Sequence, residues 1–319
     1  MITRGRFAPS PTGHLHFGSL VTALGSWLRA RATGARWVVR MEDVDRDREV
    51  PGAADSILRT LQVFGLASDE PILYQSARTA DYEAALIRLQ DGGRAYPCWC
   101  SRSDLVALGG IHPDECVVPP SSRAPTWRVR VDAAAICFED EIHGAFTQDL
   151  HREVGDFVVW RAQGFASYHL AVVVDDAAQG ITEVVRGTDL MDSTPRQILL
   201  QRLLGFASPA YAHLPLALDA DERKLSKHEA ALSIDAGNPL PALRAALRFL
   251  GQPTPATGNC TMLLSQAVRD FDIRKIPRTA AMRFHLRQRG RTFVDARGTI
   301  EDDATRRRSE QNLQKEHQS

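Results

Sequence analysis

Two lysines in one short polar segment are the first residues whose chemistry stands out. The chain has four lysines, Lys224, Lys227, Lys275 and Lys315, and arginine carries nearly all the other positive charge. Lys224 and Lys227 flank a Leu-Ser pair in the segment DERKLSKHEA, residues 221–230. A flexible ammonium group can follow charge as it develops on a phosphate, whereas a solvated surface loop, the alternative, would be served equally well by arginine. The choice of lysine favours a triphosphate-binding loop.

A second polar segment, FAPSPTGHLHFGSL at residues 7–20, is also suited to phosphate. It follows an expected strand and precedes an expected helix, whose N-terminus offers free N–H groups and a positive dipole end. Its two glycines leave room for a ligand, and His14 and His16 add hydrogen-bond donors. Their spacing resembles a P-loop, but Ser19 follows Gly18 where that motif needs lysine, so the P-loop reading fails. A Pro/Gly turn that only caps the helix is the alternative.

Cys98, Cys100, His112 and Cys116 form a compact group with the spacing of metal ligands. Alternate residues of an extended segment face the same way, so the first two thiolates can meet one ion. With the imidazole and the third thiolate they complete a Cys₃His set, which is typical of structural zinc. Buried thiols beside a surface histidine are the alternative, because a C-x-C pair is less specific than C-x-x-C.

The segments around these residues alternate between strand and helix patterns. Residues 3–9 and 35–43 are predicted strands, and residues 19–33, 52–66 and 79–93 are predicted amphipathic helices. That order implies an α/β fold with a Rossmann-like, doubly wound parallel sheet. In such a sheet the segment after the first strand faces the ligand crevice.

The composition changes along the chain divide it into parts. Residues 1–95 and 152–208 are predicted to form the Rossmann-like catalytic core, and residues 96–151, rich in Cys and Pro, a zinc-binding insertion with its own small core. Residues 209–290 hold the lysine loop and a helical region; the family resemblance given below implies that this helical region contacts a nucleic-acid stem. Residues 291–319 are polar and charge-dense, and are expected to be disordered.

Bulk properties narrow the class of protein. The formal net charge is zero, so nucleic acid would have to bind through local patches. No apolar run approaches the length of a membrane span, and the N-terminus has no signal-peptide core. A cytoplasmic enzyme is expected, with its five cysteines reduced unless metal-bound. Cys137 and Cys260, outside the cluster, are predicted to be small core residues.

Taken together, the two phosphate-binding segments resemble a known family. His16-Phe17-Gly18-Ser19, preceded by RFAPSPTG, resembles the HIGH signature of class I aminoacyl-tRNA synthetases in its glutamyl form. Residues 224–228, KLSKH, resemble the companion KMSKS signature, about two hundred residues later. The resemblance runs from about residue 3 to residue 271. It implies catalytic roles for His16, Lys224 and Lys227, and ATP binding by His14, His16, Gly18, Ser19 and Lys227, with Mg²⁺ accompanying the ATP.

The resemblance also implies a glutamate pocket. Positions that match the pocket of the glutamyl enzymes are Arg6, Ala8, Ser10, Glu42, Tyr168 and Arg186. Glu42 would meet the substrate ammonium, and Arg186 would pair with its γ-carboxylate. The alternatives are ordinary surface ion pairs for the two arginines and a core aromatic for Tyr168.

The cysteine cluster resembles the zinc site of the short glutamyl-tRNA synthetase paralogues, the glutamyl-queuosine tRNA(Asp) synthetases. In that group the third ligand is usually tyrosine, and here His112 takes its place. The chain is also expected to lack the anticodon-binding domain of full-length glutamyl enzymes. The implied reaction forms glutamyl-adenylate from L-glutamate and ATP and transfers glutamate to queuosine in the anticodon of tRNA(Asp). Neither a membrane nor a protein partner is implied.

Three other functions remain open from the sequence. One is a truncated glutamyl-tRNA synthetase that charges the 3′ end of tRNA(Glu). The second is a catalytically idle paralogue that binds tRNA or a partner protein. The third, a small HIGH-type nucleotidyltransferase, is disfavoured by the insertion and by the match to the glutamate pocket.

Overall fold

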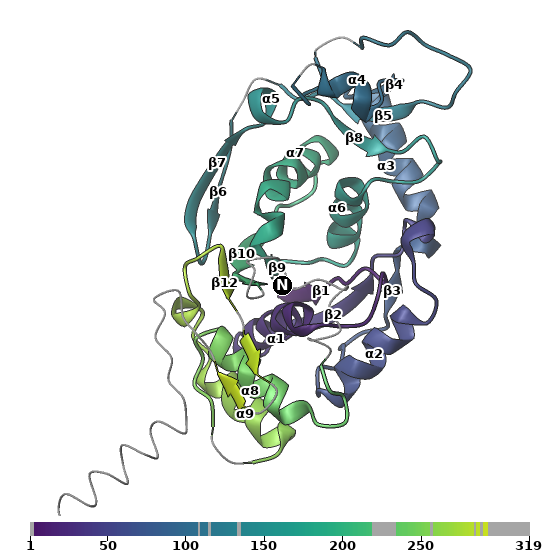
Figure 1. Cartoon of the computed structure of the whole chain (residues 1–319). Helices are drawn as coiled ribbons and strands as arrows, with labels where there is room; N and C mark the ends of the chain where they lie inside the picture. Colours follow the sequence, from purple (N-terminus) through teal and green to yellow (C-terminus); the bar gives the residue numbers. More distant parts are fainter. Residues whose placement is uncertain are drawn as a thin grey trace, which may run out of the picture.

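The structure of the chain is a computed structural model that describes residues 3–107, 109–113, 116–132, 135–218, 234–255, 258–283, 285–287 and 290–292 (Figure 1). The main helices are α1 (Phe17–Ala32), α2 (Ala53–Val63), α3 (Thr79–Asp91), α6 (Tyr168–Ala178), α7 (Thr194–Leu204), α8 (Pro239–Phe249) and α9 (Cys260–Asp270), and the short ones are α4 (Arg102–Val106) and α5 (Leu150–Glu153). The first strands are β1 (Arg4–Phe7), β2 (Arg36–Met41), β3 (Leu73–Tyr74), β4 (Ala95–Cys98), β5 (Thr126–Val129), β6 (Ala135–Asp140) and β7 (Gly144–Asp149). The later strands are β8 (Phe157–Trp160), β9 (Glu183–Gly187), β10 (Ala210–Leu214), β11 (Leu216–Leu218), β12 (Ala281–Arg283), β13 (His285–Arg287) and β14 (Gly290–Thr292).

The main sheet of the described chain has seven strands in the order β3-β2-β1-β9-β10-β6-β7. Neighbours from β3 through β6 are parallel, and β7 returns antiparallel to β6. From β1 the strand order runs one way to β2 and β3 and the other way to β9 and β10. The sheet is therefore doubly wound, as the sequence predicts, and its order reverses at β1 and β9, where ligands bind in such folds.

Helices cover both faces of this sheet (Figure 1). One face packs on α1, which is flanked by α8 and α9, and the ring of Phe17 meets the ring of Phe249 edge to face at 5.9 Å. A side chain at Gly25 would lie 2.6 Å from the Leu214 side chain, so glycine lets α1 approach the sheet closely. The other face packs on α3, α6 and α7. Strand β2 contributes to both cores, with Val39 on one face and Val38 on the other.

The sheet memberships differ from the boundaries expected from the sequence. Strands β6 and β7, expected inside the insertion, and β10, expected beyond the core, all belong to the main sheet. Strand β8, expected in the core, instead pairs with β5 in a three-stranded antiparallel sheet, β4-β5-β8. An apolar run indicates a buried strand without indicating its partner, so the sheet membership of these strands could not be predicted. The division into domains itself stays a prediction.

The predicted helices at residues 19–33, 52–66 and 79–93 correspond to α1, α2 and α3. Within the described part of the chain, every helix is too short or too polar to cross a membrane. Residues 293–319, most of the expected disordered tail, lie outside the described residues.

Candidate active site and metal centre

A cavity of about 520 Å³ opens at the carboxyl ends of β1, β2 and β9, where the order of the main sheet reverses. Its lining comes from β1 and the turn after it, the end of β2, the start of α6 and the end of β9. All the described residues predicted for glutamate or nucleotide line this cavity: Arg6, Ala8, Ser10, His14, His16, Gly18, Ser19, Glu42, Tyr168 and Arg186. The predicted Lys224 and Lys227 lie outside the described residues.

The turn before α1 places the polar side chains of His14 and His16 near the N-terminus of that helix. His16 is the N-cap of α1: its Nδ1 accepts a hydrogen bond from the backbone N–H of Ser19 at 3.4 Å. The other ring nitrogen lies 3.0 Å from the Ser19 hydroxyl, so a neutral imidazole with its proton on Nε2 satisfies both contacts. His14 contacts the Ser56 hydroxyl at 2.7 Å. The first turn of α1, with its positive dipole end, thus borders the cavity.

A buried ion network reaches the cavity through Arg6 and Glu42, which both line it. Arg40 is fully buried and lies 2.8 Å from Asp176 and 3.4 Å from Glu42, while Arg6 lies 3.3 Å from Asp176. Burial raises the pKa of Glu42 to about 7, although Arg40 and Arg6 oppose the shift. Burial also acts to raise the pKa of Asp176, but Arg6 and Arg40 hold it below its usual value. Glu42 therefore titrates near neutral pH, where a cation in the cavity would stabilise its charged form.

Arg186 is a buried cation whose neighbours are neutral. Its side chain donates to Gln197 Oε1 at 2.8 Å, Thr194 Oγ1 at 2.7 Å and the Leu190 carbonyl at 3.2 Å. It lies more than 95% buried, since its exposed fraction is 3%. Among the described residues, Arg186 forms no ion pair with a carboxylate. A buried charge of this kind is costly unless an anion occupies the cavity beside it.

Two further residues hold Arg186 from behind. The Nε–H of Arg186 donates to His213 Nε2 at 3.1 Å, and His213 Nδ1 lies 2.6 Å from Asp140 Oδ2. Both His213 and Asp140 are fully buried. Since Nε2 accepts, the proton of neutral His213 lies on Nδ1, facing Asp140. Burial lowers the pKa of His213, although Asp140 acts to raise it. The lowered pKa keeps the His213 ring neutral.

The residues that hold Arg6, Glu42 and Arg186 in place were not predicted from the sequence. Arg40, Asp176, His213 and Asp140 are charged or polar residues within apolar strands or a largely apolar helix, which was the available signal. Their partners lie far away in the chain, so spacing could not pair them. The surface ion-pair alternative for Arg6 and Arg186 is wrong, because both side chains are buried.

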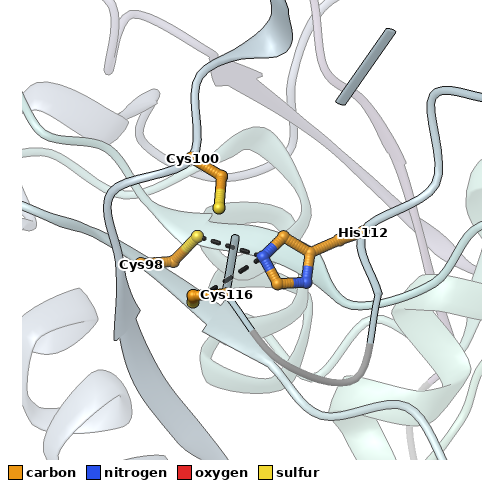
Figure 2. Close-up of side chains that lie close together, drawn as sticks. All are labelled: Cys98, Cys100, His112 and Cys116. Carbon is orange, nitrogen blue, oxygen red and sulfur yellow. Dashed lines mark hydrogen bonds between the residues drawn. The ribbon is translucent and has the colours of Figure 1, made fainter. Parts of the chain in front are cut away.

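The four predicted metal ligands meet in the insertion. The ligand atoms of Cys98, Cys100, His112 and Cys116 all lie within 4.8 Å of one another. Figure 2 shows the three thiols turned toward the imidazole, whose Nε2 lies 3.2 Å from Cys98 Sγ and 3.8 Å from Cys116 Sγ. The two cysteines of the C-x-C pair are both buried. The histidine is buried too, so the alternative of a surface histidine is wrong.

The surroundings of the cluster suit a bound cation. His112 Nδ1 lies 2.6 Å from the Pro113 carbonyl, which places a proton there and leaves the Nε2 lone pair toward the thiols. Buried Arg128 donates to Cys98 Sγ at 3.2 Å. Burial acts to raise the pKa of Cys98, but hydrogen bonds from Cys100 N–H and Arg128 hold it below its usual value. Burial and the two other thiols raise the pKa of Cys116 to about 12, a crowding that a metal ion would reverse.

The two other cysteines do not join this site. Cys260 is half-buried, whereas Cys137 is exposed, so the prediction of a core residue is wrong for Cys137. Strand β6 pairs with β7, and Cys137 lies on the face of this pair that is exposed to solvent.

Comparisons with known proteins agree with this geometry. Residues 3–110 and 120–306 match the family model described as tRNA synthetases class I (E and Q), catalytic domain. A protein of Xanthomonas campestris pv. campestris (strain 8004), named glutamyl-Q tRNA(Asp) synthetase, is 56% identical over 88% of this chain and 95% of its own length. One of the same name from Neisseria meningitidis serogroup C is 48% identical over 86% of this chain and 98% of its own.

A solved structure shares the architecture. The glutamate tRNA ligase of Elizabethkingia meningosepticum in complex with its amino acid has a TM-score of 0.75 and 25% identity, over 89% of this chain and 67% of that one. The cavity at the switch point, the signature residues around it and the close relatives converge. The chain therefore belongs to the catalytic-domain family of class I tRNA synthetases for E and Q, within the group of proteins named glutamyl-Q tRNA(Asp) synthetase.

Proposed function

We propose that this chain activates L-glutamate with ATP and transfers the glutamyl group to queuosine in the anticodon of tRNA(Asp). The names of its close relatives and its synthetase domain support the reaction. The observation that most supports glutamate as the substrate is Arg186. This buried cation borders the cavity and has no carboxylate partner in the described chain. A second carboxylate of the substrate would supply that charge.

The cavity offers complementary groups for the rest of glutamate. Glu42 lines the cavity and would pair with the α-ammonium, which would keep the Glu42 carboxyl ionised. Tyr168, 3.5 Å from Arg186, would orient the γ-carboxylate. Ala8 and Ser10, after the end of β1, would border the substrate backbone. Arg6, held by Asp176, would face the α-carboxylate side of the site.

Activation would take place between glutamate and the start of α1. An oxygen of the glutamate α-carboxylate attacks the α-phosphorus of ATP, the bond to the bridging oxygen breaks, and pyrophosphate leaves. His16 and Ser19, with the first N–H groups of α1 and the neighbouring His14 and Gly18, would bind the phosphates. Lys227, supported by Lys224, would neutralise the charge that develops on them. Mg²⁺ bound by the ATP phosphates would supply further charge neutralisation.

Transfer would use the same cavity. A hydroxyl oxygen of the queuosine cyclopentene ring attacks the carbonyl carbon of the adenylate, loses its proton and releases AMP. Queuosine lies in an anticodon loop, whose unpaired bases can enter a protein cavity. ATP and tRNA are both used in the cytoplasm, and we place the enzyme there.

Zinc is the metal that best fits the Cys₃His cluster. Three sulfurs and one nitrogen are its usual structural donors, and imidazole is a good replacement for the tyrosine of related proteins. Cys98 and Cys100 would hold it from the end of β4, with His112 and Cys116 from the following loop. Such a site would join the loop to the three-stranded sheet without touching substrate. Arg128 would offset the negative charge of three thiolates around one divalent ion.

Exchanging Arg186 for glutamine tests the substrate assignment. In ATP–pyrophosphate exchange, Arg186→Gln should raise the KM for glutamate by roughly 30-fold or more, the scale of one lost buried charge partner. Its control is Arg152→Gln on α5, whose arginine side chain is 84% exposed and lies outside the cavity. An unchanged KM for glutamate in a folded Arg186→Gln protein would show that Arg186 does not bind the substrate carboxylate.

One structural observation favours a second candidate function. Glutamate tRNA ligases are among the solved structures that share this fold over most of the chain. Charging of the 3′ end of tRNA(Glu) would use the same activation step, so only the acceptor separates the two functions.

A further inference from the structure

A second cavity, of about 310 Å³, is lined by residues from two segments that also line the first. These two segments form the partition between the cavities. The turn between β8 and α6 places Arg161 in the first cavity and Phe165 in the second. The segment after β2 places Glu42 in the first cavity and Arg46 in the second. Nothing in the activation of glutamate uses this second cavity.

Two adjacent acids of α6 hold the walls of the two cavities. Buried Asp175 accepts hydrogen bonds from Gln75 Nε2 at 2.8 Å and the Tyr82 hydroxyl at 2.7 Å, and both partners line the second cavity. Its neighbour Asp176 lies 2.8 Å from Arg40 and 3.3 Å from Arg6, which lines the first cavity. One buried polar network therefore fixes both cavities, and the second is a preformed site rather than a gap between loops.

The rim of the second cavity carries groups suited to an unpaired nucleotide. Phe165 is half-buried, lines the second cavity and belongs to neither of the two large hydrophobic clusters of the described chain, and the Arg161 guanidinium lies 5.7 Å from the centre of its ring. A hydrogen bond from Arg161 N–H to the Phe165 carbonyl, at 2.9 Å, closes the turn that presents the ring. The side chains of Gln163 and Arg46 are exposed beside it. An aromatic face, an amide and a cation are the groups that stack on a base, bind its edge and pair with a phosphate.

We propose that the second cavity binds the nucleotide next to the glutamate acceptor in the same RNA strand, with its base stacked on Phe165. This inference rests on the proposed function, because it needs an RNA acceptor in the first cavity. Neighbouring nucleotides of a splayed loop enter neighbouring cavities, so the partition formed by Arg161 and Phe165 would pass between two consecutive bases. The cavity would thereby select an anticodon loop over an isolated nucleoside.

Protein and RNA changes combined can test this contact. The acceptors are a queuosine-containing anticodon stem-loop and two versions that lack the base on the 5′ or the 3′ side of queuosine. The proteins are the unaltered chain, Phe165→Ala, Phe165→Trp, which keeps an aromatic face, and the control Arg152→Ala on α5, outside both cavities. ATP–pyrophosphate exchange, which needs no RNA, checks that each variant folds and activates glutamate.

One abasic position should raise the KM for the stem-loop by roughly tenfold with the unaltered chain, the scale of one lost base stack. Phe165→Ala should raise the KM for the intact loop by a similar factor, and the two changes together should cost no more than either alone. Phe165→Trp and Arg152→Ala should stay near the unaltered KM, with exchange unchanged throughout.

Two results would overturn the proposal in different ways. If Phe165→Ala leaves the KM of the intact loop unchanged, or if its effect multiplies with both abasic changes, the second cavity does not bind a neighbouring base. If the unaltered chain exchanges pyrophosphate but transfers no glutamate to the intact loop, the proposed acceptor fails, and this inference fails with it.

Discussion

The titration of Glu42 gives a direct test of the glutamate site. Its carboxyl lines the cavity, and burial raises its pKa to about 7, against the opposing charges of Arg40 and Arg6. Only the ionised form can pair with the substrate ammonium. Binding of glutamate must therefore expel a proton from Glu42 whenever the pH lies below that pKa.

The size of the effect follows from the fraction of protein with an ionised Glu42. For a pKa of about 7, roughly one tenth of the molecules are ionised at pH 6 and roughly nine tenths at pH 8. The apparent affinity falls by the fraction of competent protein. The KM for glutamate should thus rise about tenfold between pH 8 and pH 6, while Glu42→Gln should raise the KM at pH 8 and abolish its pH dependence.

The pH dependence of the free energy of unfolding gives a second test of the raised Glu42 pKa. The raised pKa means that folded protein keeps a proton on Glu42 that unfolded protein releases, between the ordinary value of 4.5 and about 7. Wild-type stability should therefore fall relative to Glu42→Gln as the pH rises through that window, by at most about 1.4 kcal/mol per pH unit, and the gap should level off above it. ATP–pyrophosphate exchange and thermal unfolding across pH measure both effects. A glutamate KM that is flat from pH 6 to 8 in the wild type would refute this role.

Three other changes test the remaining parts of the site. His213→Phe removes the acceptor for the Arg186 Nε–H and should raise the KM for glutamate roughly 5- to 100-fold, the cost of an unsatisfied buried group; a KM like that of the wild type would contradict the positioning role. Gly155→Ala, at φ +65° and 2.8 Å from a backbone oxygen of the metal loop, should lower bound zinc from one per chain, whereas Gly205→Ala, at φ +67° in open space, should keep it, as elemental analysis can show. An equal zinc content in both variants would show that the loop holding His112 is not needed to bind the metal. Lys227→Ala should slow adenylate formation by roughly 10²–10³, and near-normal pyrophosphate exchange would refute its role.

The site could be predicted from sequence where each part lies in a short segment. The turn before α1, the C-x-C pair and Glu42 at the end of an apolar strand all carry their meaning in local residue types and spacing. The structure brings ten of the predicted residues to one cavity and four to one metal cluster. Such features can be predicted because the chemistry at a sheet edge depends on the few residues that follow each strand.

Long-range partners could not be predicted in this way. His213 and Asp140 lie 73 residues apart and meet only because β10 and β6 are neighbours in the main sheet. The same pairing placed β6 outside the expected insertion. A strand's apolar pattern says that it is buried, whereas its neighbours are decided by packing of the whole chain.

The identity of the acceptor separates the proposed reaction from its alternatives, and labelled glutamate can identify that acceptor. Labelled glutamate and ATP are supplied with tRNA(Asp) that contains or lacks queuosine, and with tRNA(Glu). We expect label to be retained only on the queuosine-containing tRNA(Asp), in a fragment that holds the anticodon. Label on the 3′ end of tRNA(Glu) would contradict it in favour of a truncated glutamyl-tRNA synthetase, and no activation of glutamate at all would favour an idle RNA-binding paralogue.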